Sequence, residues 1–504
     1  MIDDIPKGWA KTVLDEAGSW CSGGTPSRTK PEFFGKGIPW IKSGDLPDGP
    51  ILKTEEQITE LGLQNSSAKL LPAGALSMAL YGATIGKLGR LTFPAATNQA
   101  CANVVPDVRM IEPDYLFYYL YSERREFIEQ GQGGAQPNIS QEIVRSHPLW
   151  LAPLAEQRRI VARLRLLLAK ADYCGLRLVK IPLILKRLRQ SVLAAACSGR
   201  LTADWREEHA EMQPVSPLVR GLLKERLAKA ETISQKRRLE AIIGHAEEHN
   251  SDELPDNWQY FTLEKVCESF DYGTSAKSQV TGKFPVLRMG NLQDGEIDWE
   301  NLLYTSDRAE IVKYQLKPNT VLFNRTNSPE LVGKTAIYRG ERPAIFAGYL
   351  IRINPFDNVL LPDYLNSCLN TMYARDYCLH VKSDGVSQSN INAQKLGKFE
   401  VPLPPFPEQQ EIVRRVAQLF KVADQIEIRF SKANEQVNAL TQSILSKSFR
   451  GELVTPEAAL AEAEGREFES AAQLLARIKS LSKPVNKNGA GPIRMRGLGA
   501  RLGR

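Results

Sequence analysis

The sequence predicts an α+β fold with two globular domains separated by two long antiparallel coiled-coil helices, in an internal pseudo-twofold repeat. Three observations predict this fold. The length of 504 residues is enough for about three or four folding units. The sequence contains an internal repeat, and each copy carries a heptad stripe at the same place. Apolar residues make up 42% of the chain and charged residues 24%, which is typical of globular proteins and argues against a fibrous or largely disordered chain.

The repeat is clearest in one block of each half. Residues 151–201 pair with residues 403–453 without a gap, and 18 of the 51 positions are identical. Upstream the two halves still match, as in PKGW at 6–9 and PDNW at 255–258, but the offset changes. Insertions are tolerated on surfaces and resisted where elements must stay in register. Each copy therefore combines a globular domain of variable length with a helix of fixed length, which we call the length-locked block. The predicted parts are a first globular domain at 1–150, a first spacer helix at 151–206, a charged helical connector at 207–254, a second globular domain at 255–400, a second spacer helix at 401–456, and a C-terminal helix with a basic, disordered tail at 457–504.

Both length-locked blocks carry the stripe of a coiled coil. Apolar residues follow alternating steps of four and three, starting at Ile160 in the first copy and at Ile412 in the second. We expect the two helices to pair along this seam, which contains Ile160, Leu164, Leu167, Leu178, Leu185, Leu188, Ile412, Val416, Leu419, Phe430, Val437 and Leu440. The alternative is that each helix folds back separately onto its own globular domain. Pro182 lies inside the first seam and predicts an interruption there, whereas its counterpart Asn434 predicts none.

The globular domains mix short strand-like runs with helical stretches. Residues 38–42, 320–324 and 334–339 read as strands between Gly, Pro and Asn turns, whereas 113–130 has the pattern of a helix. This mixture predicts the α+β class.

The residue types argue against several kinds of chemistry. Seven cysteines and five histidines occur without a C-x-x-C or H-E-x-x-H arrangement, which argues against a disulfide framework, a structural zinc site and histidine-based metal catalysis. Fragments that resemble cofactor, catalytic or phosphate loops, at 33–37, 403–406 and 333–335, each lack a residue or a following helix that the chemistry requires. We therefore predict no catalytic residue, no metal ligand and no cofactor site in this chain. The sequence shows neither a signal-peptide pattern nor an apolar run of membrane-spanning length, so we expect a cytoplasmic protein that contacts no membrane.

Basic and polar side chains point to a polyanionic partner. The net charge is +7, and residues 156–206 alone carry 12 Lys and Arg against 3 Asp and Glu. Arg favours the guanine edge and Asn the adenine edge in the major groove of DNA. The candidate DNA-contacting residues are Trp40, Lys42, Asp45, Arg288, Asn291, Arg325, Asn327, Arg177 and Lys180. For each of them the alternative is a structural or merely solvent-facing role. The two domains are similar in layout but differ in sequence, and the helices hold them apart. This arrangement predicts a DNA target with two different half-sites and an unread spacer between them.

These features resemble a known family. Each length-locked block opens with Glu-Gln-x-x-Ile-Val, at 156–161 and 408–413, and closes with Ser-[Val/Ile]-Leu followed by Gly-x-Leu, at 191–201 and 443–453. In these motifs and in its two-copy layout the chain resembles the specificity subunits of type I restriction-modification systems, over about residues 1–456.

The resemblance implies a function as well as a fold. It implies that the globular domains are target recognition domains for double-stranded DNA, that the chain is not catalytic by itself, and that two methyltransferase subunits dock on the helices. It also implies that restriction subunits can join the complex, and that S-adenosylmethionine, ATP and magnesium serve those partners, which methylate adenine and cut unmodified DNA. The alternatives from other functional classes are a protein-protein adaptor with a coiled-coil spacer and a self-contained methyltransferase.

Overall fold

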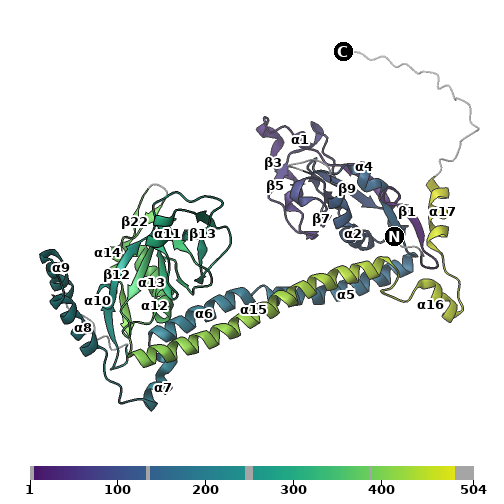
Figure 1. Ribbon diagram of the computed structural model, residues 1–504. Coiled ribbons are helices and arrows are strands. Elements are labelled where there is room, and N and C mark those ends of the chain that lie inside the picture. The colour runs from purple at the N-terminus through teal and green to yellow at the C-terminus, as the bar shows by residue number, and fades with distance from the viewer. Residues whose placement is uncertain (1–4, 132–136, 245–253, 386–387, 483–504) are drawn as a thin grey trace, which may run out of the picture. The chain divides into compact units, whose positions relative to one another are not determined.

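The computed structural model describes residues 5–131, 137–244, 254–385 and 388–482 (Figure 1). The chain divides into two compact units: the first contains residues 1–178 and 433–504, and the second contains residues 179–432. The first unit is therefore built from both ends of the chain, whereas the second is contiguous. Each unit contains one globular domain together with a part of each spacer helix. The basic tail that the sequence predicts from residue 483 onward lies outside the described residues.

The domain of the first unit is built on a five-stranded sheet in the order β2-β9-β6-β7-β4. Its strands are β2 (Gly18–Ser22), β9 (Cys101–Pro106), β6 (Leu76–Ala79), β7 (Leu88–Leu91) and β4 (Gly49–Ile51). A three-stranded sheet follows the order β5-β3-β8, with β5 (Glu56–Ile58), β3 (Phe34–Ile41) and β8 (Ala96–Thr97), and β1 (Ala10–Val13) pairs with β10 (Pro148–Leu151). The helices are α1 (Glu60–Gln64), α2 (Pro113–Ser122), α3 (Arg124–Glu129) and α4 (Gln141–Ser146). Only the pairs β4–β7 and β3–β8 are parallel among the described strands of this unit.

The domain of the second unit repeats this topology. Its main sheet has the order β12-β21-β17-β19-β15-β14, with strands at Cys267–Tyr272, Leu350–Pro355, Thr320–Asn324, Thr335–Tyr338, Gly295–Ile297 and Leu292–Gln293. The smaller sheet β16-β13-β20 contains Leu303–Thr305, Phe284–Leu287 and Ile345–Phe346, and β11 (Gln259–Thr262) pairs with β24 (Glu400–Leu403). A third sheet, β18-β23-β22, joins Thr326–Asn327, Ser389–Asn390 and Ser383–Asp384. The helices are α10 (Leu263–Val266), α11 (Arg308–Tyr314), α12 (Pro362–Leu369), α13 (Met372–Val381) and α14 (Ala393–Gly397). The shared strand order confirms the α+β class and the internal repeat.

The predicted elements lie where their patterns indicate. Residues 320–324 form β17, which is buried at every position. Its central residues are all apolar because Val321 and Phe323 face one core cluster and Leu322 faces another. The helical pattern at 113–130 divides into α2 and α3, with Pro113 at the first position of α2, where its missing N–H is not needed.

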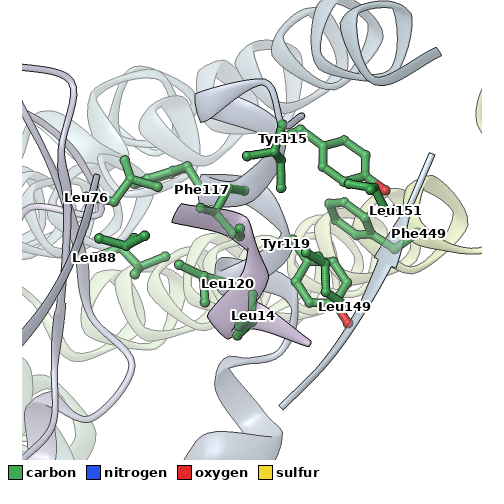
Figure 2. Packing of buried hydrophobic residues seen from close by; sticks show 14 of the residues in the cluster. Leu14, Leu76, Leu88, Tyr115, Phe117, Tyr119, Leu120, Leu149, Leu151 and Phe449 are labelled. Atoms are coloured by element: carbon green, nitrogen blue, oxygen red, sulfur yellow. The ribbon is translucent and has the colours of Figure 1, made fainter. Parts of the chain in front are cut away.

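Aromatic rings pack among aliphatic side chains in the core of the first unit (Figure 2). Tyr115 and Tyr119, one turn apart on α2, both pack edge-to-face against Phe449, with ring centroids 5.2 and 5.1 Å apart. Their hydroxyl groups donate to backbone carbonyls of β10, those of Trp150 and Pro148. The buried phenols thus satisfy their polar ends while their rings fill the core.

The spacer helices differ at the position where the sequence predicts a difference. The first spacer is interrupted: α5 (Leu154–Leu178) ends before α6 (Ile181–Cys197), and Pro182 lies in the first turn of α6, where it needs no N–H acceptor. The second spacer, α15 (Phe406–Phe449), is one helix of 44 residues that is about 66 Å long at 1.5 Å per residue and passes Asn434 without a break. The predicted effect of Pro182 is confirmed.

Within the second unit the two helices run antiparallel. Arg189, in the middle of α6, pairs with Asp424 and Glu427 of α15 at 2.7 and 2.9 Å. Thr202, beyond the end of α6, donates to Glu408 at the start of α15. Residue numbers therefore rise along α6 as they fall along α15. In the first unit, Ile160 and Leu164 near the start of α5 share a cluster with Ile444, Leu445 and Phe449 near the end of α15, which gives the same direction.

Burial along the predicted seam is greatest where the helices meet the domains. Ile160, Leu164, Leu185, Ile412 and Val416 are buried, Leu167, Leu178, Phe430 and Val437 are half-buried, and Leu188, Leu419 and Leu440 are exposed by 38 to 52%. The buried members belong to clusters that also contain residues of the globular domains. The helix ends thus pack both on each other and on a domain, so the two alternatives drawn from the sequence occur together. Pairing along the whole seam stays a prediction.

Helices from the predicted connector and from the predicted C-terminal segment pack on the domains. In the second unit, α8 (Ser216–Ala228) contributes Val219 and Leu223 to the core, and α9 (Ile233–Gly244) packs against α8; α7 (Ala203–Glu208) precedes them in the chain. In the first unit, α16 (Glu457–Glu464) is followed by α17 (Ala471–Ser482), which contributes Leu474 and Ile478 to the core (Figure 1). The helix α8, within the predicted helical connector 207–254, thus also belongs to the core of the second unit. Among the described residues, no helix combines the length and apolar character needed to cross a lipid bilayer.

Candidate nucleic-acid interface

The first spacer helix is fixed to its domain by the buried Glu156. Its Oε1 accepts a hydrogen bond from Trp9 Nε1 at 2.9 Å, and its Oε2 accepts one from the backbone N–H of Glu457 at 2.8 Å. Burial raises the pKa of Glu156, and these two hydrogen bonds oppose that rise. Glu457 in turn pairs with Arg159 of α5, so the segment after α15 is tied to the start of α5.

Glu408 does the same for the second spacer helix. It is fully buried, and its carboxylate accepts hydrogen bonds from Trp258 Nε1 and the Thr202 hydroxyl, each at 2.8 Å, and from the Arg206 guanidinium. Trp9 and Trp258 come from the matching PKGW and PDNW segments, so those segments recur because each supplies the indole that the glutamate binds.

Gln157 and Gln409 complete this anchor in the two copies. Each side chain makes three hydrogen bonds with backbone groups of its domain, namely Glu112 N–H, Met110 C=O and Ala152 C=O for the first, and Leu361 N–H, Val359 C=O and Pro404 C=O for the second. Buried polar side chains that are hydrogen-bonded to the domain in this way position the helix and are not available to bind a ligand. The Glu-Gln motif is therefore structural.

A polar and aromatic surface lies at the end of the main sheet of the second domain. The Arg325 guanidinium stacks over the Tyr272 ring at 4.6 Å and donates to Asn390 Oδ1 at 3.3 Å. Tyr272 is 41% exposed and Tyr349 is 47% exposed, and Asn327 lies beside Arg325 in half-buried surroundings. No described residue accepts a hydrogen bond from the buried Nε of Arg325. We call Tyr272, Arg325, Asn327, Tyr349 and Asn390 the second-domain patch; it combines aromatic faces with groups that can bind base edges or phosphates.

The first domain has the same backbone arrangement with other side chains. In the second domain Thr326 pairs with Asn390, and the N–H of Ile391 donates to the carbonyl of Arg325. In the first domain Tyr81 pairs with Asn138, and the N–H of Ile139 donates to the carbonyl of Leu80. Tyr81 is 47% exposed and Asn138 is also exposed. The pair Tyr81 and Asn138 is the first-domain patch.

The structure brings Trp40, Lys42 and Asp45 together, but as parts of a local framework. Trp40 is 2% exposed, and its Nε1 donates to the carbonyl of Gly24 at 3.0 Å. The Lys42 ammonium pairs with Glu56 at 2.8 Å, a contact that raises the pKa of Lys42 and lowers that of Glu56. Asp45 accepts the backbone N–H of Lys42. Burial of Trp40 argues against direct contact with a base, whereas Lys42 and Asp45 remain half-exposed.

Arg288 and Asn291 occupy the equivalent turn of the second domain. Asn291 is 3% exposed; its Oδ1 accepts the N–H of Arg288 and its Nδ2 donates to the carbonyls of Asp298 and Glu300. With every polar group of Asn291 bonded within the turn, the geometry argues against a base contact there as well. The half-buried Arg288 donates to the carbonyl of Asn301 at 3.0 Å.

Arg177 and Lys180 lie on either side of the helix interruption, and both are exposed. The Arg177 guanidinium lies 5.8 Å from the centre of the Tyr173 ring. Their exposure allows contact with phosphates, and it fits the solvent-facing alternative equally well. DNA contact through Arg325, Asn327, Arg177, Lys180, Lys42, Asp45 and Arg288 stays a prediction.

The sequence analysis missed the three exposed tyrosines of the two patches. Tyr81, Tyr272 and Tyr349 carry no motif of their own. The repeated segment QPNIS at 136–140 and QSNIN at 388–392 is a signal for Tyr81, because Asn138 pairs with it; in the second domain the segment pairs with Thr326 and Arg325.

The described residues contain no group of three or more His, Cys, Asp and Glu side chains that could hold a metal ion. The fragment at 33–37 leads into strand β3, and Lys334 of the fragment at 333–335 donates to Gln293 Oε1 at 2.7 Å. The fragment at 403–406 runs from β24 into α15. These fragments thus have structural places in the fold.

Comparison with known proteins relates this chain to one protein family. The family model for the type I restriction modification DNA specificity domain matches residues 6–172 and 255–436. The chain is 28% identical over 492 residues to the StySPI type I restriction enzyme specificity subunit of Salmonella potsdam, covering 94% of this chain and 96% of that protein. It is 31% identical over 353 residues to the EcoBI specificity subunit of Escherichia coli, covering 68% of this chain and 66% of that protein. A chain of a solved type I restriction-modification system shares the fold, with a TM-score of 0.59 and 18% identity over 89% of this chain and 99% of that one.

Proposed function

Because this chain belongs to the family of type I restriction-modification DNA specificity domains, we propose that it reads double-stranded DNA with its two globular domains, one half-site per domain. The proposed target is asymmetric and bipartite, and the spacer helices set the length of the unread spacer. The proposed reading surfaces are the first-domain patch and the second-domain patch.

One observation carries the proposal: the two domains present the same backbone pairing with different side chains. Tyr81 of the first domain corresponds to Thr326 of the second and Leu80 corresponds to Arg325, whereas asparagine is present in both at 138 and 390. A constant backbone with variable side chains supports two readers of one kind that prefer different bases.

The chain is proposed to be non-catalytic and to lend its specificity to partner enzymes. Two adenine methyltransferase subunits, and restriction subunits where they are present, are the proposed partners, and S-adenosylmethionine, ATP and magnesium are proposed to serve those partners. The proposed place of action is the cytoplasm, since the proposed substrate is cellular DNA.

The test maps the adenines that are methylated in host DNA. The map is recorded for cells without this chain and for cells with the wild type, Arg325→Ala or Arg237→Ala. Arg237 is an exposed residue of α9 whose loss removes the same charge without touching the patch. We expect one bipartite motif for wild type, none without the chain, a relaxed half-site for Arg325→Ala, and the wild-type motif for Arg237→Ala. Loss of a base contact costs about 1–3 kcal/mol of discrimination, so only bases in one half-site should change.

A second measurement separates this function from that of a protein-protein adaptor. Phosphate contacts make affinity for a duplex fall steeply as salt rises, so binding of the target duplex by the chain with its methyltransferase partners should weaken between 50 and 200 mM salt by roughly tenfold or more. A methylation pattern that does not depend on the chain, together with duplex binding that is insensitive to salt, would contradict the proposal.

A further inference from the structure

The two units differ at one pair of equivalent core positions. In the first unit this pair is Tyr119 of α2 and Phe449 at the end of α15, which pack edge-to-face in the core (Figure 2). In the second unit the corresponding residues are Cys368 of α12 and Cys197 at the end of α6. The preceding helical turn fixes the equivalence, because Tyr364 donates to the carbonyl of Pro402 as Tyr115 does to that of Trp150. Two thiols thus replace two aromatic rings.

The two thiols are in direct contact. Their sulfur atoms lie 3.2 Å apart, with Cys197 donating to Cys368, and a disulfide bond needs them roughly 2.0 Å apart. Cys368 is 2% exposed and Cys197 is half-buried. The residues are 171 positions apart in sequence, so a bond between them would join the spacer helix α6 to the domain helix α12.

A small cavity gives access to this pair. It has a volume of about 260 Å³ and a mainly apolar lining that includes Ala194, Cys197, Cys368, Met372, Tyr373 and Phe399. A molecule of the size of hydrogen peroxide fits within this cavity. The pair is therefore reachable although Cys368 itself is buried.

We propose that Cys197 and Cys368 are a modification site, a dithiol that hydrogen peroxide converts into an intramolecular disulfide. The Cys197 sulfur attacks the peroxide, the O–O bond breaks, and a sulfenic acid and one water form. The Cys368 sulfur then attacks the sulfenic sulfur, its proton leaves with the hydroxyl group as a second water, and the S–S bond forms. In total, two thiols are oxidised by two electrons and one peroxide is reduced to two waters.

The surroundings assign the order of the two steps. Burial raises the pKa of Cys368, which disfavours the thiolate that attacks peroxide, so this buried thiol does not react first. Cys197 is the more exposed of the two and takes the first step. This inference is independent of the proposed DNA-reading function.

Peptide mapping of the full chain tests the site. The reduced protein is treated with a few equivalents of hydrogen peroxide, quenched, unfolded in N-ethylmaleimide, digested and analysed by mass spectrometry. We expect a cross-linked pair of peptides containing Cys197 and Cys368, which dithiothreitol separates. Cys197→Ser should abolish the cross-link, whereas Cys174→Ser, which removes an exposed cysteine of α5, should leave it unchanged.

A second readout does not depend on a variant. An internal bond across 171 residues makes the unfolded chain more compact, so oxidised wild type should migrate faster on a non-reducing denaturing gel and return to its reduced position with dithiothreitol. Recovery of Cys197 and Cys368 as separately alkylated or overoxidised residues would overturn the proposal, as would cross-linked dimers in place of the internal bond.

Discussion

Glu408→Gln tests whether the glutamate of the Glu-Gln motif holds the second spacer helix on its domain. The carboxylate receives three donors, from Thr202, Arg206 and Trp258, and it is fully buried. Glutamine keeps the size of the side chain, but it has one oxygen, and its NH2 group cannot accept. At least one donor therefore loses its partner, and Arg206, whose side chain is 19% exposed, loses its counter-charge.

The magnitude follows from these contacts. A buried donor without an acceptor costs about 1–3 kcal/mol, and a buried ion pair broken on one side costs about 3–5 kcal/mol. Arg206 keeps its hydrogen bond to the Gly199 carbonyl and some solvent contact, which favours the lower end, so we expect a loss of about 3 kcal/mol. The matched control is Glu156→Gln, whose carboxylate binds Trp9 and a backbone N–H but no arginine, and for which we expect about 1–2 kcal/mol.

Hydrogen exchange measured by mass spectrometry on the full chain is the assay. A loss of about 3 kcal/mol speeds exchange by local opening roughly a hundredfold, so amides near 199–206 and 408–412 should exchange much faster in Glu408→Gln. Amides near 156–161 should keep their wild-type rates. Exchange near 408–412 within about threefold of wild type would refute the reasoning, since it would mean that the buried carboxylate contributes little.

Two further predictions concern α15. The Arg414 and Arg415 side chains lower the pKa of Glu411 to about 2, and the ordinary, higher pKa returns on unfolding. The ionised carboxylate therefore stabilises the fold fully above about pH 4.5, and this contribution is lost as the pH falls toward 2. Urea unfolding should show Glu411→Gln less stable than wild type by about 1–2 kcal/mol at pH 7 and nearly equal to it close to pH 2; a constant difference at both pH values would contradict this. Ile412→Lys buries a charge at a fully buried core position and should lower stability by about 4 kcal/mol, whereas Leu440→Lys, at a seam position that is 52% exposed, should change it by about 0.5 kcal/mol or less; equal melting temperatures for the two variants would contradict the burial pattern.

The helices could be predicted from the sequence because their signals are local. The heptad spacing and the position of Pro182 are local features of the sequence, and the helices and the interruption that they predict are present in the structure. The strand at 320–324 was equally readable, since the apolar run Val321, Leu322 and Phe323 indicates burial on both faces.

The candidate site was less predictable because its parts come from distant segments. The second-domain patch joins Tyr272 of β12 to Arg325 after β17 and to Asn390 of β23, more than 100 residues away from the tyrosine. The burial of Trp40 likewise depends on its hydrogen bond to Gly24, in another segment of the chain. Residue type indicates which side chains are able to contact a base. It does not indicate which of those side chains are buried in the folded domain.

The division of the chain between the units also determines the order of assembly during synthesis. Residues 179–432 form a contiguous unit, which can complete its core as soon as they leave the ribosome. The first unit has to wait for the end of α15 and for α17, whose Leu474 and Ile478 fill its core. The domain that is translated first is therefore the last to become complete, and a message truncated after about residue 432 would yield a finished second half joined to an unfinished first half.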